Sequence, residues 1–314
     1  MMAEATPADV LKVDLTTVIE RLSLVAPLGL RFWDQVSGRT IGDGLLVTAY
    51  PETQPYRRVQ AFSNPSGIYV LHHVPGLREV ETGQGDQGFW DHHPPQSPFV
   101  LEVVDRERRF QPFLLRLALP VRGVFNWQLP AGESPPADML GVPLYSAPNR
   151  VVPAAMAVLR ADLWDPRGGP DRTGGPAAWA VLAAHVPGQP IVRGIADAQG
   201  RVALIFAYPE LVTNVLASPP LASPLSPPEG GTALRQQAWS ITLQAAYEPQ
   251  DPIPALPNLD KVLAQPLARL WDDFERTELT QVTLRFGQEL IVYSRDAGGV
   301  RQSKLFITPT GSPP

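Results

Sequence analysis

Apolar residues along this chain occur in short runs, and turn signals end most of them. Residues 44–50 and 113–119 each form an apolar run that a proline follows directly, and residues 240–247 alternate between apolar and polar positions. Short runs rich in β-branched and aromatic residues are typical of strands. The pattern therefore predicts an all-β protein. Further strands are predicted at residues 28–33, 67–71, 99–104, 155–164, 177–185, 191–196, 201–208, 281–286, 289–294 and 305–308.

One stretch near the C-terminal end has the spacing of a helix. Apolar residues between Leu259 and Phe274 recur about every 3.6 positions, as on one face of a helix. Asn258 can cap the start, because its side chain accepts a hydrogen bond from a free backbone N–H. Pro266 lies inside the stretch and would kink the helix or split it. We therefore predict a short C-terminal helix in an otherwise β protein.

Two series of strands carry the same landmarks in the same order. Each series begins with a Trp-Asp pair, passes through a strand to an Asx-x-x-Gly turn, and ends with a strand that a proline stops. Glycine suits the turn because it adopts positive φ at little cost, and tryptophan can fill the space between two sheets. The repeat predicts two tandem β-sandwich domains. The landmarks are residues 33–34, 64–67 and 74–75 in the first series and 164–165, 197–200 and 208–209 in the second.

Proline content helps to divide the chain into parts. There are 36 prolines among 314 residues, about twice the usual share. Several lie between the two strand series together with Ala, Gly and Ser, which predicts a linker. The predicted parts are an N-terminal arm at 1–21, a first β-sandwich at 22–128, a Pro-rich linker at 129–149, a second β-sandwich at 150–250, and a C-terminal helix with strands at 251–314 that acts as a docking element.

Composition limits the classes of function. The formal net charge is −5, which argues against a nucleic-acid-binding protein because such proteins carry a basic face. Only 18% of the residues are charged, so we expect a surface that is largely neutral or covered by partners. The sequence has no cysteine, which excludes disulfides and thiolate metal sites. No apolar run approaches the ~20 residues of a membrane span, and the first residues lack the features of a secretory signal, so we expect a cytoplasmic protein.

Motifs of catalysis and cofactor binding are weak in this chain. Gly83, Gly85 and Gly88 match the G-x-G-x-x-G pattern, but the residues after them do not predict the helix whose N-terminus would face a phosphate. Residues 91–93, Asp-His-His, are the best metal-ligand candidate, and a simple loop is the interpretation that we favour. We therefore predict no catalytic residue, no metal, no cofactor and no small-molecule substrate. We therefore expect that this protein is not an enzyme. The alternative is a hydrolase whose catalytic site carries no recognisable motif.

Aromatic and arginine residues near predicted loops are the candidates for contact with a partner. Residues 105–109 form a mixed-charge run between two strands, which would be either a solvated hairpin tip or a docking point for carboxylates. The aromatic candidates would either pack inside a domain or anchor an interface, as Trp and Arg often do. The candidate interface residues are Phe89, Trp90, Arg106, Arg108, Arg109, Phe125 and Trp127.

Two stretches resemble transthyretin-like, carboxypeptidase-regulatory-like sandwich domains. They are residues 40–76, where Asn-Pro-Ser-Gly precedes Ile-Tyr-Val-Leu-His-His-Val-Pro-Gly, and residues 188–209, which contain Gly-Ile-Ala-Asp-Ala-Gln-Gly-Arg-Val. Other segments resemble those of proteins encoded in clusters for extracellular contractile injection systems, which are phage-tail-like particles. These segments are residues 31–34, 103–113, 119–123 and 286–290.

This resemblance implies a structural component at one end of such a particle. The component would be a cap adaptor or a baseplate part, and its partners would be tube, sheath, cap or baseplate proteins. The resemblance implies no catalytic residue. A carbohydrate- or peptide-binding sandwich is the alternative, because exposed aromatic rings and open strand edges suit such ligands.

Overall fold

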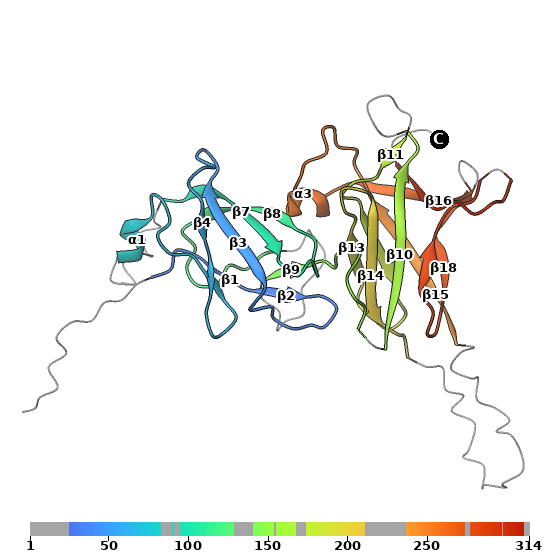
Figure 1. Ribbon diagram of the computed structural model, residues 1–314, viewed down its shortest axis with the longest axis horizontal. Helices are drawn as coiled ribbons and strands as arrows, with labels where there is room; N and C mark the ends of the chain where they lie inside the picture. Colours follow the sequence, from blue (N-terminus) through green and yellow to red (C-terminus); the bar gives the residue numbers. More distant parts are fainter. Residues whose placement is uncertain are drawn as a thin grey trace, which may run out of the picture.

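The computed structural model describes residues 25–82, 90, 95–128, 141–153, 155–167, 174–210, 237–273, 277–296 and 298–310. These residues form two lobes that lie side by side, the first from the N-terminal part of the chain and the second from the C-terminal part (Figure 1). Both lobes consist of strands with only short helices. The prediction of an all-β protein with two sandwich domains and a short C-terminal helix is confirmed.

The first lobe encloses a core between its sheets. One sheet has the order β4-β3-β7-β8, a second has the order β1-β6-β5, and β2 pairs in parallel with β9. Side chains of β8 alternate between buried and less buried positions, as expected where one face of a sheet covers a core. The chain passes from β4 to β5 through buried Ala61, so residues 59–63 form an edge of both sheets. The elements are β1 (Gly29–Leu30), β2 (Phe32–Asp34), β3 (Leu45–Pro51), β4 (Val59–Gln60), β5 (Phe62–Ser63), β6 (Tyr69–Val70), α1 (Arg78–Thr82), β7 (Ser97–Asp105), β8 (Phe113–Leu119) and β9 (Val142–Leu144).

The second lobe is an eleven-stranded sheet wrapped around its own core. The first half of β10 pairs with β14 and β19, and its second half pairs with β11 and β20. β15 pairs with β12, β16 and β18, which brings the C-terminal strands into the same sheet. The elements are β10 (Met156–Asp165), β11 (Gly175–Pro176), β12 (Val181–His185), β13 (Val192–Ile195), β14 (Arg201–Ala207), β15 (Ala238–Ala246), α3 (Leu259–Leu263), β16 (Leu267–Asp273), β17 (Thr277–Glu278), β18 (Gln281–Arg285), β19 (Leu290–Val292) and β20 (Leu305–Pro309).

The pairing of strands repeats from one lobe to the other. β1 pairs antiparallel with β6 as β10 does with β14, and β2 runs parallel to β9 as the end of β10 runs parallel to β20. The two turns also match, because the side chains of Asn64 and Asp197 each accept hydrogen bonds from two backbone N–H groups. Gly67 and Gly200 have φ values of 71° and 78°, which glycine adopts without steric cost. The repeat seen in the sequence is therefore a repeat of strand pairing and turn geometry.

The predicted helix over residues 259–274 is wrong beyond its first turn. Helix α3 begins as predicted, with the Asn258 side chain accepting a hydrogen bond from the Lys261 N–H, but it ends at Leu263. The chain after Pro266 forms β16, which pairs with β15 and β20. Proline ends the helix, and the neighbouring strands then supply partners for the extended backbone. The C-terminal segment, predicted as a separate docking element, thus contributes β16 to β20 to the sheet of the second lobe.

Residues 141–147 differ from the prediction of a Pro-rich linker. They include β9, and Val142, Leu144 and Tyr145 are at most 1% exposed in the core of the first lobe. Pro143 has no N–H to donate, but the N–H of Val142 bonds to the carbonyl of Arg31 and holds the strand in place. Composition alone predicted a linker because it ignores the apolar residues between the prolines.

Buried contacts join the two lobes. Trp179 and Ile195 of the second lobe, together with helix α3, pack into the hydrophobic core of the first lobe. The Gln111 Nε2 donates a hydrogen bond to the carbonyl of Ile195 at 3.2 Å, and the Trp127 Nε1 donates one to the Asp260 carboxylate at 2.9 Å. A shared core of this kind favours one arrangement of the two lobes.

Candidate functional site

The aromatic candidates for a partner interface are used mainly inside the chain. Trp127 is only 5% exposed and donates its hydrogen bond to α3, so it joins the two lobes and is not free to anchor a partner. Phe125 and Trp90 are half-buried against the core of the first lobe. Phe89 lies outside the described residues. Their sequence positions beside loops gave no sign of these internal contacts.

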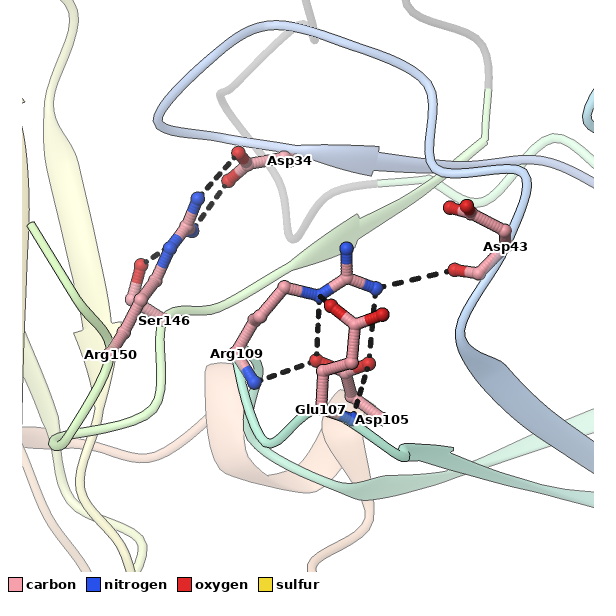
Figure 2. Close-up of polar contacts among 7 residues, drawn as sticks. All are labelled: Asp34, Asp43, Asp105, Glu107, Arg109, Ser146 and Arg150. Carbon is pink, nitrogen blue, oxygen red and sulfur yellow. Dashed lines mark hydrogen bonds and ion pairs between the residues drawn. The ribbon is translucent and has the colours of Figure 1, made fainter. Parts of the chain in front are cut away.

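The arginine run at the tip of the β7–β8 hairpin separates into two kinds of residue. Arg109 donates from Nε and Nη2 to the two carboxylate oxygens of Asp105, each at 3.1 Å, and from Nη2 to the carbonyl of Asp43 (Figure 2). The hydrogen bond with Asp105 raises the pKa of Arg109, so this guanidinium stays charged. Arg106 and Arg108 are exposed. Arg109 therefore stabilises the hairpin, and Arg106 with Arg108 gives it a positive tip.

Arg108 holds a strained position in this turn. Its φ is 56°, in the left-handed region, and the Asp105 side chain accepts backbone N–H bonds from Glu107 and Arg109. The corresponding positions in the two repeated Asx turns are Gly67 and Gly200, which tolerate positive φ. A side chain at such a position costs about 1 kcal/mol. An exposed arginine is thus kept where glycine would be more stable.

A buried ion pair lies beside this hairpin. Arg150 donates from Nη1 and Nη2 to the two carboxylate oxygens of Asp34 at 2.8 and 2.7 Å, and Nη1 also donates to the Ser146 hydroxyl (Figure 2). The side chains of Asp34 and Arg150 are 3% and 11% exposed. Burial alone would raise the pKa of Asp34, but hydrogen bonds from Arg150 and Ser37 outweigh it and hold the pKa below the usual value. The pair ties the end of β2 to the segment that leads into the second lobe.

Phe110 connects the two polar clusters. Its ring is buried, and the guanidinium carbons of Arg109 and Arg150 are 5.2 and 4.9 Å from the ring centroid. Cations at these distances are attracted to an aromatic face. The sequence marked Asp34 only as a landmark of the repeat and did not indicate Arg150, because a partner 116 residues away leaves no local pattern.

The counterpart of Asp34 in the second repeat is Asp165, which is also buried. It lies beside Tyr247, and burial together with the carboxylate of Asp165 raises the pKa of that phenol well above its usual value. Each repeat thus keeps a buried acid after its tryptophan and gives it a different partner.

The exposed apolar residues form a different surface from the one that the sequence indicated. Tyr56, in the turn between β3 and β4, is 76% exposed, Phe62 on β5 is 63% exposed, and Leu267 at the start of β16 is 66% exposed. Exposed aromatic side chains are frequent anchors of protein interfaces. Sequence reasoning missed them because Phe62 sits two residues before a turn, where a strand end can be buried or open.

Within the described ranges, no three His, Asp or Glu side chains lie together as metal ligands, and the candidate at residues 91–93 lies outside those ranges. No described helix has the length and apolar character needed to cross a membrane.

The fold and these surfaces define a two-lobed, all-β protein with an open sandwich edge. No protein-family model matches the sequence, and no curated protein matches it. The Bacillus anthracis TIE protein is similar with a TM-score of 0.23 and 7% identity over 90% of this chain, which spans 34% of that protein. An adhesin candidate from Bacteroides ovatus has a TM-score of 0.21 and 12% identity over 100% of both chains. At these TM-scores neither similarity bears on function.

Proposed function

We propose that this chain is a structural subunit of a contractile, phage-tail-like injection particle, acting as an adaptor between proteins at its cap or baseplate end. The observation that carries the proposal is the joining of two sandwich lobes through a shared core, with Ile195 and α3 of the second lobe buried in the first. A body of this kind holds its outer surfaces at a set distance and angle, which is the work of an adaptor. The kind of particle is inferred from the resemblance of several sequence segments to proteins of contractile injection systems.

The outer surface offers contacts of two types for such partners. The β3–β4 turn presents Tyr56 and β5 presents Phe62, and the β7–β8 tip presents Arg106 and Arg108. Apolar aromatic side chains provide burial, and exposed arginines pair with carboxylates of a neighbour. Retaining Arg108 at a strained φ supports a role for its charge, because glycine would serve the turn better.

Affinity purification from the native cell tests the proposal. The tagged wild-type chain is compared with Arg106→Glu/Arg108→Glu, and Arg39→Glu serves as the control because Arg39 is exposed in the same lobe. Recovery of sheath, tube, cap or baseplate proteins in fixed ratios, reduced by the double variant alone, is the expected result. Recovery of the tagged chain without any particle protein would contradict it.

A carbohydrate- or peptide-binding module is the second candidate. The exposed ring of Phe62 on the open 59–63 edge and that of Tyr56 in the turn before β4 favour it, because a peptide can add to such an edge and a ring can stack on a sugar. Trp127 cannot take part, since it is buried between the lobes. Glycan and peptide array binding by the purified chain, lost on Tyr56→Ala, would support this candidate over the first.

A further inference from the structure

The tip of the β7–β8 hairpin, residues 105–109, is held from behind by the second lobe. The Nε2 of Gln111, which follows the tip, donates a hydrogen bond to the carbonyl of Ile195 in β13. The N–H of Leu114, near the start of β8, donates one of 2.7 Å to the carbonyl of Pro257, just before α3. The limb of the hairpin that leaves the tip therefore depends on acceptors that the first lobe does not supply.

Helix α3 contributes side chains to the core of the first lobe. Leu259 and Val262 of this helix are 0% and 1% exposed and pack in that core. The Asp260 carboxylate, on the same helix, accepts the hydrogen bond from the indole of Trp127. Figure 1 shows α3 between the two lobes. The first lobe is therefore complete only when a helix that follows β15 in the chain is docked on it.

Phe110 links this core to the charged residues that shape the tip. It is 3% exposed and packs in the same core as Ile195 and α3. The guanidinium of Arg109 is bonded to the Asp105 carboxylate and to the carbonyl of Asp43 (Figure 2). Its carbon also lies 5.2 Å from the centroid of the Phe110 ring. A continuous series of contacts thus runs from the joint between the lobes to the tip.

We propose that the hairpin tip and the joint between the lobes are energetically coupled, so that the tip keeps its binding shape only while α3 and β13 are docked on the first lobe. Undocking would remove the acceptors of the Leu114 N–H and the Gln111 Nε2, together with part of the packing around Phe110. A buried polar group without a partner is costly, so these losses disfavour the present position of the hairpin limb. The coupling is reciprocal, and a partner bound at the tip stabilises the docked joint by the same factor.

The inference rests on the proposed function only in taking the tip as a site where a partner binds. It adds a condition to that site: Arg106 and Arg108 are presented in their binding arrangement by a chain whose two lobes are docked. Binding at the tip then selects the docked adaptor over a chain whose second lobe is detached, because a partner favours the state that it binds more tightly. The kind of particle does not enter the inference.

Hydrogen–deuterium exchange of the purified full chain, read by mass spectrometry, tests the coupling without any partner. Val262→Ala removes two methyl groups from the joint. Val292→Ala is the matched control, because Val292 is 4% exposed in the separate core of the second lobe. The backbone amides of residues 106–111 should exchange about tenfold faster in Val262→Ala, since loss of buried methyl groups lowers local stability by roughly this factor. In Val292→Ala the same amides should keep the wild-type rate.

The reverse direction is tested from the hairpin side. Gln111→Leu removes the hydrogen bond to Ile195 and changes no residue of α3, whose Val262 and Ala264 amides donate to the carbonyls of residues 258 and 260. Both amides should exchange about threefold faster, as expected for the loss of one hydrogen bond.

Three results would overturn the inference. They are tip amides that keep the wild-type rate in Val262→Ala, α3 amides that keep it in Gln111→Leu, and tip amides that Val262→Ala and Val292→Ala accelerate equally. Exchange is measured on the free chain, whereas the affinity purification measures the recovered particle proteins. Failure of the coupling and failure of the proposed function therefore give different results.

Discussion

Replacing Arg150 by methionine should destabilise the protein strongly. The change removes two charge-assisted hydrogen bonds to Asp34 and one to Ser146, and leaves a carboxylate that is 3% exposed without its counter-charge. Breaking a buried pair from one side costs about 3–5 kcal/mol, because the remaining charge stays desolvated. Methionine keeps the length of the side chain, so lost packing contributes little to the loss.

Guanidinium chloride unfolding followed by tryptophan fluorescence measures the effect, since the chain has seven tryptophans. The midpoint should fall while the slope m stays unchanged. Arg116→Met is the control: Arg116 pairs with Glu52 at 3.2 Å, but the two side chains are 57% and 41% exposed, so the loss should be about 0–1 kcal/mol. Asp34→Asn in the Arg150→Met background should recover part of the loss, because it removes the unpaired charge. Equal losses for Arg150→Met and Arg116→Met would refute the reasoning.

Three further predictions concern charge and backbone strain. The folded state lowers the pKa of Asp34 below 3.8, so this carboxylate stabilises the protein above that pH. The contribution is lost as the pH falls through the lower pKa of the folded state. Acid titration of the free energy of unfolding should show this loss in the wild type and not in Asp34→Asn. Arg108→Gly should raise stability by about 1 kcal/mol in chemical unfolding because φ is 56°, whereas Arg106→Gly, at a residue without positive φ, should not. Gly200→Ala should lower the free energy of unfolding by about 2–4 kcal/mol, since its Cβ would lie 2.2 Å from a carbonyl oxygen of β10. Gly188→Ala has a similar φ but open space around its Cβ, so it should lower that free energy by about 1 kcal/mol. Equal losses for the two variants would contradict this prediction.

The candidate surfaces show where sequence reasoning reached its limit. The charged run at 105–109 was expected at a hairpin tip, and the structure has a hairpin there with Arg106 and Arg108 exposed. The same reasoning did not separate them from Arg109, because the bonds of Arg109 with Asp105 and Asp43 depend on how the turn folds back. Phe62 and Ile195 occupy equivalent positions in the repeat, and only the docking of one lobe on the other makes one buried and one exposed.

The sequence by itself determined most of the strands, the Asx turns and the repeat. These features depend on local chemistry: alternating apolar residues, an Asx side chain that accepts its own turn's N–H groups, and glycine at positive φ. The tertiary structure decided that the residues after Pro266 form β16, that residues 141–147 are buried and that Asp34 pairs with Arg150. Each of these depends on contacts between segments far apart in the chain, and such contacts leave no periodic pattern in the residues that make them.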